Sequence, residues 1–167
     1  MPQQKIKIPI RKKFKPQERE LIAQEVIDYI VNRTKEGRDK NENPFPGYSK
    51  KYINSKDFSI AGKSRSPVDL TLTGEMLDSL KLLRHSPGEI VIGYDKGDTE
   101  LNGKVEGNIK GTYGNSTPLR GKKRDFLGIT RKKRIEIQDQ YDVSKVDRAT
   151  ILERIARLRA VTGNGEE

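Results

Sequence analysis

The charged side chains are the residues of this chain that could do chemistry, and their types exclude most kinds of active site. The sequence holds one histidine, His85, and no cysteine. These counts exclude metal sites made of several histidines or thiolates, and they leave His85 as the one residue that could serve a histidine-based triad. Next to Arg84 on a strand, His85 is expected to be a surface residue rather than a general base. The remaining carboxylates are scattered, and Asp95 and Asp98 lack the ligand series of a calcium loop. The sequence therefore predicts no catalytic residue, no cofactor and no metal site.

A glycine-rich stretch, residues 114–121, precedes Lys122 and has some features of a phosphate-binding loop. The glycine spacing differs from that motif, Lys123 stands where the motif needs serine or threonine, and no strand pattern precedes it. We therefore predict no nucleotide-binding loop.

Lysine and arginine are more informative, because they are concentrated in two segments. The formal net charge is +10, and residues 1–16 carry +6 while residues 120–134 carry +7. Such segments serve nucleic acid or an acidic protein surface, although solvated segments that keep a protein soluble have the same composition. The candidates for contact with nucleic acid, or with the lumen of an assembly, are Lys122, Lys123, Arg124, Arg131, Lys132, Lys133 and Arg134.

Length and composition predict one domain with a small core. The chain has 167 residues, of which 32% are hydrophobic and 35% are charged. No apolar run approaches the roughly 20 residues of a membrane span, and the N-terminus lacks the apolar region of a signal peptide. The absence of cysteine suits a protein made in reducing cytoplasm.

The densest apolar run, residues 68–94, predicts a short helix followed by a β-hairpin. Thr73 is the expected N-cap of the helix, because its hydroxyl can accept from a free N–H group of the first turn. After Leu83 the apolar period changes to two, and residues 86–88 have turn composition. One buried strand face is predicted from the alternating residues Ile90, Ile92 and Tyr94.

Four further segments have element patterns. Residues 16–35 carry an apolar stripe at helical spacing that Gly37 can end, and residues 144–161 carry a second such stripe. Residues 123–129 predict an apolar strand. Residues 5–15 fit either an edge strand or a loose arm.

Two segments leave alternatives open. Residues 101–111 have glycines four apart, which fits a helix with a smooth face or a loop with a short helical piece. Residues 131–141 fit a strand by alternation, or a helix capped by Thr130.

The expected fold is α+β. A small antiparallel or mixed sheet is built on the 81–94 hairpin and the 123–129 strand, the 16–35 helix covers it, and a C-terminal helix follows. The expected division is a basic N-terminal arm at 1–15, a core at 16–141 with a mobile loop at 57–67, and a C-terminal helix and tail at 142–167. Within the long irregular region, Phe45, Tyr48 and Tyr52 could stack bases, but anchoring a loop is the favoured interpretation.

Three segments in fixed order carry a resemblance. They are LTLTGEMLDSL at residues 70–80, the strand at 90–94 that ends in Gly-Tyr, and DFLGIT at residues 125–130. This order resembles the phage virion-morphogenesis family, the minor virion proteins of tail completion and head–tail joining. The match spans about residues 16–140, and its first and third segments are the specific ones. Asp125 stands where the family often has proline, and residues 101–114 lack the family's histidine.

The resemblance implies a small α+β subunit of the virion, assembled in the host cytoplasm. It implies a homo-oligomeric ring, expected to be a hexamer, at the neck or the head-proximal end of the tail. The implied partners are the neighbouring head–tail connector and tail proteins, with sequence-independent contact to packaged DNA and no membrane. Interface candidates are Lys12, Lys13, Phe14, Lys63, Arg65, Ile155 and Leu158.

A second hypothesis comes from a different class of protein. The two basic segments alone would suit a stand-alone nucleic-acid-binding module without sequence preference. The ring protein predicts self-association, whereas the module predicts DNA binding that weakens steeply with salt. An enzyme is the least supported of the three classes.

Overall fold

The α+β class is confirmed by the computed structural model, which describes residues 2–63, 68, 74–112, 122–143 and 148–162. Three strands, β1 (Lys5–Pro9), β2 (Lys81–Ser86) and β3 (Glu89–Gly93), form an antiparallel sheet in the order β1-β3-β2. The hairpin prediction is therefore correct. Of the two alternatives for the N-terminal segment, the edge strand is the one that forms.

The prediction of a strand over residues 123–129 is wrong. These residues run extended but pair with no strand of the described sheet, and β1 takes the third place instead. Close pairing of β1 with β3 depends on Gly93. A Cβ built there would lie 2.4 Å from the Gln4 carbonyl oxygen and 2.7 Å from Lys5 Cα.

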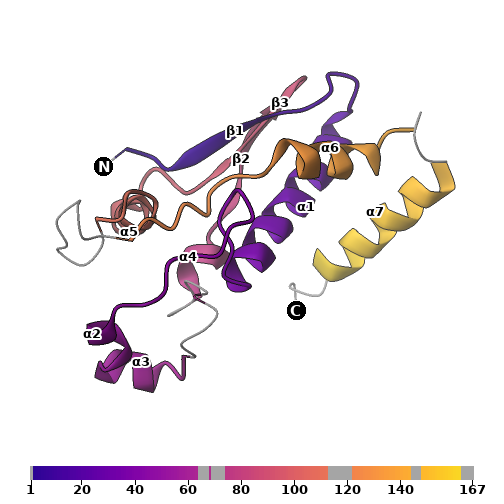
Figure 1. Cartoon of the computed structure of the whole chain (residues 1–167). Helices are drawn as coiled ribbons and strands as arrows, with labels where there is room; N and C mark the ends of the chain where they lie inside the picture. The colour runs from indigo at the N-terminus through magenta and orange to yellow at the C-terminus, as the bar shows by residue number, and fades with distance from the viewer. Residues whose placement is uncertain (1, 64–67, 69–73, 113–121, 144–147, 163–167) are drawn as a thin grey trace.

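Helix α1 (Pro16–Lys35) has the predicted bounds and covers one face of the sheet (Figure 1). Pro16 lies in the first turn, where its missing N–H is harmless. Glu18 accepts from the Lys15 backbone N–H at 2.7 Å, and Gly37 adopts a φ of 82° just after the helix. The apolar side chains that α1 buries are Ile22, Ala23, Val26, Ile27 and Ile30.

Strand β3 is central and buried on both faces. Ile90, Ile92 and Tyr94 are fully buried as predicted. Val91, on the opposite face, is only 2% exposed although the predicted alternation left that face open. Its cross-strand neighbours are Lys7 and Arg84, whose long aliphatic stems can cover an apolar side chain.

Six further helices are described, and α5 and α7 are the longest of them. They are α2 (Lys50–Ile53), α3 (Lys56–Ile60), α4 (Glu75–Asp78), α5 (Thr99–Lys110), α6 (Arg131–Asp139) and α7 (Arg148–Thr162). The glycine-rich segment is thus the helix α5, and Gly111 ends it with a φ of 74°. Thr130 caps α6 by accepting from the Lys133 N–H at 3.2 Å, which decides the second alternative.

Several boundaries differ from the predicted ones. The N-cap of α4 is Gly74, with a φ of 78°, and Thr73 lies outside the described residues. The segment predicted as a mobile loop begins inside α3, where Phe58 is 8% exposed. Residues 1–15 are not a separate arm, because they contain β1 and because Phe14, 3% exposed, joins the core. Residues 144–147, the predicted start of the last helix, are not described.

A single apolar cluster unites the elements. Leu77 of α4, Ile92 of β3 and Phe126 of the extended segment all belong to it and are each at most 1% exposed. From α7, Ile151 is 4% exposed and joins the cluster, while Ile155 and Leu158 are half-buried against it. Among the described residues, none of the helices combines the length and the apolar character that crossing a membrane requires.

Candidate partner-binding surfaces

His85 joins β2 to α1 through two contacts of its ring. Arg19 Nε donates to His85 Nδ1 at 3.0 Å, and His85 Nε2 lies 3.4 Å from the Glu20 carboxylate. Both ring nitrogens therefore face side chains of α1. Within the described part of the chain, no three histidine or carboxylate residues are placed to hold a metal ion.

The seven cations proposed for nucleic acid fall into two groups. Lys122, Lys123 and Arg124 precede the extended stretch 125–130, and the other four lie in the first turn of α6. Arg124 lies beside α5, where its N–H donates to the Asn108 carbonyl oxygen at 2.7 Å, and α6 lies at the other end of that stretch (Figure 1). The structure does not bring them together as one continuous cluster.

In the first group, only two cations are exposed. Lys122 and Lys123 lie at the surface, and Lys122 Nζ donates to the Gly47 carbonyl oxygen at 2.5 Å. Arg124 is half-buried, with its guanidinium carbon 5.5 Å from the centre of the Tyr48 ring. Burial lowers the pKa of Arg124, and its Nε has no hydrogen-bond partner among the described residues. Arg124 thus belongs to the packing of a loop more than to an open basic surface.

The rings of Tyr48, Tyr52 and Phe58 form that packing. Their centroids lie 5.2 to 5.7 Å apart, and Lys63 Nζ lies 5.2 Å from the centre of the Tyr48 ring. Rings that contact one another and two cations anchor the loop, which agrees with the interpretation favoured from the sequence.

The second group lies in the first turn of α6, where the helix dipole favours negative charge. Arg131 and Lys132 are exposed, and no acidic partner for either is found among the described residues. Lys133 pairs with Glu136 at 2.9 Å and lies 5.0 Å from the centre of the Tyr29 ring. Cations in a first turn are unfavourable for the helix dipole, so the stability of α6 does not explain them.

The interface candidates have different environments. Lys12 is exposed, whereas Lys13 Nζ bonds to Asp142 at 2.6 Å and Phe14 lies in the core. Lys63 contacts Tyr48, and Ile155 and Leu158 are half-buried on α7. Arg65 lies outside the described residues. Of this set, Phe14 is the one whose side chain the subunit itself covers.

Sequence reasoning missed the arginine that holds the extended segment. Arg33 of α1 is 1% exposed and donates to the Gly128 carbonyl oxygen at 2.7 Å and to the Phe126 carbonyl oxygen. Burial lowers the pKa of Arg33 to about 10. The available signal was its place three residues after Ile30, on the apolar stripe of the helix.

A second missed feature connects the N-terminal segment to the end of α6. Arg11 bonds to Asp139 at 2.5 Å and to Asp142 at 2.8 Å, and Lys13 bonds to the other oxygen of Asp142. The Asp142 side chain is 3% exposed. No local pattern indicates this network, because its members are about 130 residues apart.

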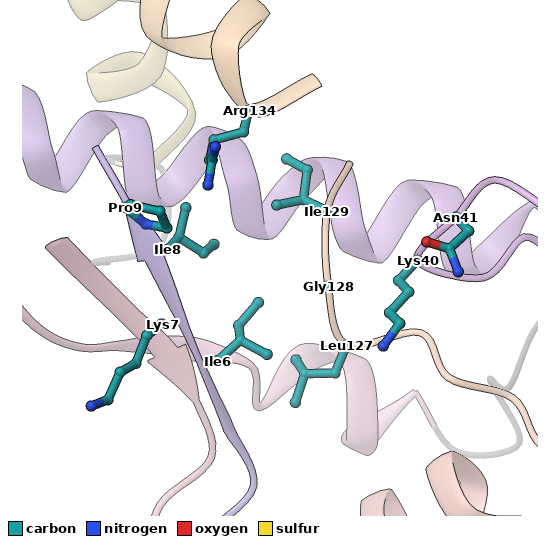
Figure 2. Close-up of a pocket in the computed structure, with 10 residues that line it drawn as sticks. All are labelled: Ile6, Lys7, Ile8, Pro9, Lys40, Asn41, Leu127, Gly128, Ile129 and Arg134. Atoms are coloured by element: carbon teal, nitrogen blue, oxygen red, sulfur yellow. The ribbon is translucent and has the colours of Figure 1, made fainter. Parts of the chain in front are cut away.

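A groove follows the outer edge of β1. One cavity of about 320 Å³ lies between β1 and the extended residues Leu127 to Ile129, and Figure 2 shows apolar side chains from both sides directed into it. A second cavity of about 310 Å³ continues past Pro9 to Ile135 on α6. Both are lined by Pro9 and Arg134, so they adjoin one another along β1, and we refer to them together as the groove.

The comparisons with known proteins gave no match: no family model matches the sequence, and no curated protein and no solved structure shows significant similarity.

Proposed function

We propose that this chain is a structural protein of a tailed-phage virion that assembles as a ring at the neck or the head-proximal end of the tail. DNA would pass through the ring, and neighbouring connector and tail proteins would bind its two sides. One observation carries the proposal. The three segments behind the resemblance converge in one core, because Leu77, Ile92 and Phe126 belong to a single buried cluster.

That convergence supports the proposal because it gives the spacing of the three segments a physical reason. Separate weak motifs can arise anywhere in a sequence, whereas motifs that pack together define a fold. In this chain, Arg33 adds a specific connection by binding the carbonyl groups of the third segment. The family resemblance thus rests on one packing unit rather than on unrelated stretches.

The described surface also supports assembly. Val143 and Leu152 are 65% and 56% exposed around the start of α7, and Ile60 of α3 is 83% exposed. A contact between two different patches can repeat around an axis until a ring closes. A small subunit with a thin core gains buried apolar area by such a contact.

Light scattering on the purified protein tests this proposal. We expect self-association that rises with concentration, or that begins when neck or tail proteins are added. Replacing Leu152 by glutamate should weaken the association, whereas replacing the exposed Arg157 by glutamine, on another side of the same helix, should leave it unchanged. A protein that stays monomeric at high concentration and with those partners would contradict the proposal.

A stand-alone nucleic-acid-binding module is the second candidate, and the first turn of α6 favours it. Arg131 and Lys132 are exposed cations whose position costs helix stability, and DNA phosphates would reverse that cost. The matching test uses double substitutions that leave the buried Arg124 in place. Lys122→Gln with Lys123→Gln is compared with Arg131→Gln with Lys132→Gln, and binding of a DNA duplex is measured against salt concentration.

If the module is correct, each lost phosphate contact should reduce the slope of log affinity against log salt by about 1. The ring protein instead predicts weak binding by the monomer and little difference between the two double variants. Absence of binding at about 50 mM salt would exclude the module.

A further inference from the structure

The outer edge of β1 has backbone groups that no strand of the described sheet uses. The Gln4 carbonyl accepts from the Tyr94 N–H at 3.1 Å, and the Ile10 N–H donates to the Gly88 carbonyl at 3.0 Å. In an antiparallel pair, alternate residues bond to the same neighbour, so residues 4, 6, 8 and 10 face β3. The N–H and C=O groups of Lys5 and Lys7, and the C=O of Pro9, therefore point to the opposite side.

That side is the groove. Its far wall is the extended segment Leu127 to Ile129, and its apolar lining includes Ile6, Ile8, Leu127 and Ile129 (Figure 2). The Lys7 side chain points away from the cavity in the same view, so Lys7 presents its backbone to the groove. An open strand edge beside an apolar floor is the arrangement that binds an added β-strand.

The far wall does not pair with β1 in the described sheet. Arg33 binds the Phe126 and Gly128 carbonyl groups, and the Lys40 N–H binds the Asp125 carbonyl at 2.9 Å. These bonds fasten the segment to α1 and to the loop that holds Lys40, so they help to fix its place beside the groove.

Charge selects the kind of strand that fits. Arg134 lines both cavities, its side chain extends toward Pro9 and Ile8, and no carboxylate bonds to its guanidinium among the described residues. Lys40 lines the other end and is paired with Asp125 at 2.7 Å. An arginine without an acidic partner at a groove favours a carboxylate from outside.

The charge at this edge argues against β1 of a second copy as the occupant. That strand would bring its own Lys5 and Lys7 to a groove lined by Arg134, whereas an acidic segment is attracted. We propose that an extended acidic segment of a partner protein adds to β1 as a fourth strand. Its alternate apolar side chains would pack on Ile6 and Ile129, which are only half-buried, and one carboxylate would bind Arg134. The proposal does not depend on the virion assignment.

A fluorescein-labelled octapeptide, Ser-Glu-Ser-Val-Ser-Val-Ser-Ser, serves as the probe, because in a strand its glutamate and both valines lie on one face. We expect saturable binding by fluorescence anisotropy, with much weaker binding of peptides in which lysine replaces glutamate or glycine replaces valine. Equal binding of the peptide with glycine in place of valine would show charge attraction alone and would overturn the proposal. Absence of binding at about 1 mM peptide would also overturn the proposal, because a dissociation constant above that concentration means a very weak interaction.

Paired variants separate the backbone edge from the side chains. Lys7→Pro removes an N–H that faces the groove and should weaken binding by about tenfold or more. Lys7→Ala removes the charge but keeps that N–H, so its affinity should stay within about twofold of the original, because the Lys7 side chain points away. Arg134→Ala should weaken binding, whereas Arg131→Ala on the exposed side should not. Equal affinities of the two Lys7 variants would contradict strand addition.

Hydrogen exchange provides a readout that needs no variant. Peptide saturation should slow exchange of the Lys5 and Lys7 amides in the unmodified protein, while amides of α7 should exchange as before. Unchanged protection of those two amides would overturn the proposal. Sedimentation of the free protein tests the other possible occupant, which is a second copy of this chain. Self-association that Lys7→Pro abolishes would show that a second copy binds the β1 edge, and this result would also overturn the proposal.

Discussion

Glu25 makes the stability of this fold depend on pH. Tyr141 donates to its carboxylate at 2.7 Å, and burial raises the pKa of Glu25 above its usual value. A carboxyl whose pKa is higher in the folded state binds its proton first in that state. Acidification from neutral pH through the raised pKa therefore increases the contribution of Glu25 to stability, down to the ordinary value near 4.5.

The substitution Glu25→Gln removes this titration and keeps an acceptor for Tyr141. The free energy of unfolding of the variant, minus that of the original protein, should fall as the pH is lowered from 7 toward 4.5. Denaturant titrations at a series of pH values measure this difference. A difference that stays constant, or rises, over that range would contradict the assignment, and Glu75→Gln at an exposed position of α4 is the control.

Asp142 is the second residue whose replacement we expect to lower the free energy of unfolding. Its buried carboxylate accepts from both Arg11 and Lys13, which fastens the N-terminal segment to the end of α6. Asp142→Ala removes the buried anion that Arg11 and Lys13 share and should cost about 2–4 kcal/mol. Thermal or urea unfolding checks this, and Asp57→Ala, at an exposed position of α3, should cost less than about 0.5 kcal/mol.

At the scale of elements, the extended segment after α5 depends on one side chain. Arg33 supplies two hydrogen bonds to carbonyl groups that have no sheet partner. Arg33→Met keeps most of the volume but removes both donors, so we expect a loss of about 2–4 kcal/mol. Faster hydrogen exchange at Gly128, whose N–H bonds to the Phe126 carbonyl, should accompany the loss in stability. A stable variant with unchanged exchange would show that the segment is held by apolar packing alone.

The same segment shows what the sequence could not predict. Phe126, Leu127 and Ile129 were predicted to be buried in a strand; Phe126 and Leu127 are buried and Ile129 is half-buried, in a segment that is extended but not a strand. The apolar pattern of a sequence predicts which residues are buried. Whether a segment belongs to a sheet depends on the partners of its backbone hydrogen bonds. Those bonds go to Arg33 and Lys40, both distant in the sequence.

Elements with complete local patterns were predictable. Helix α1 has a stripe, a proline in its first turn and a glycine after its end, and its bounds agree with the structure. The hairpin has its change of period and its turn residues. The groove along β1 was not predictable, because it arises from two segments about 120 residues apart that approach without pairing.

At the scale of the whole molecule, the basic residues do not form one continuous surface. The two groups of candidate cations are separated by the extended stretch 125–130, and Arg124 and Lys133 are occupied by aromatic rings. A lumen formed by several copies could gather such separate groups around an axis, which a monomer cannot do. This arrangement favours the ring over the stand-alone module, and the salt dependence of DNA binding distinguishes the two.

An electron-microscopy image of the purified protein, alone and with neck or tail proteins, tests the central claim most directly. The account predicts closed rings of equal subunits around an open centre, wide enough for a DNA duplex. Isolated single subunits under every one of these conditions, or open chains that never close, would contradict it.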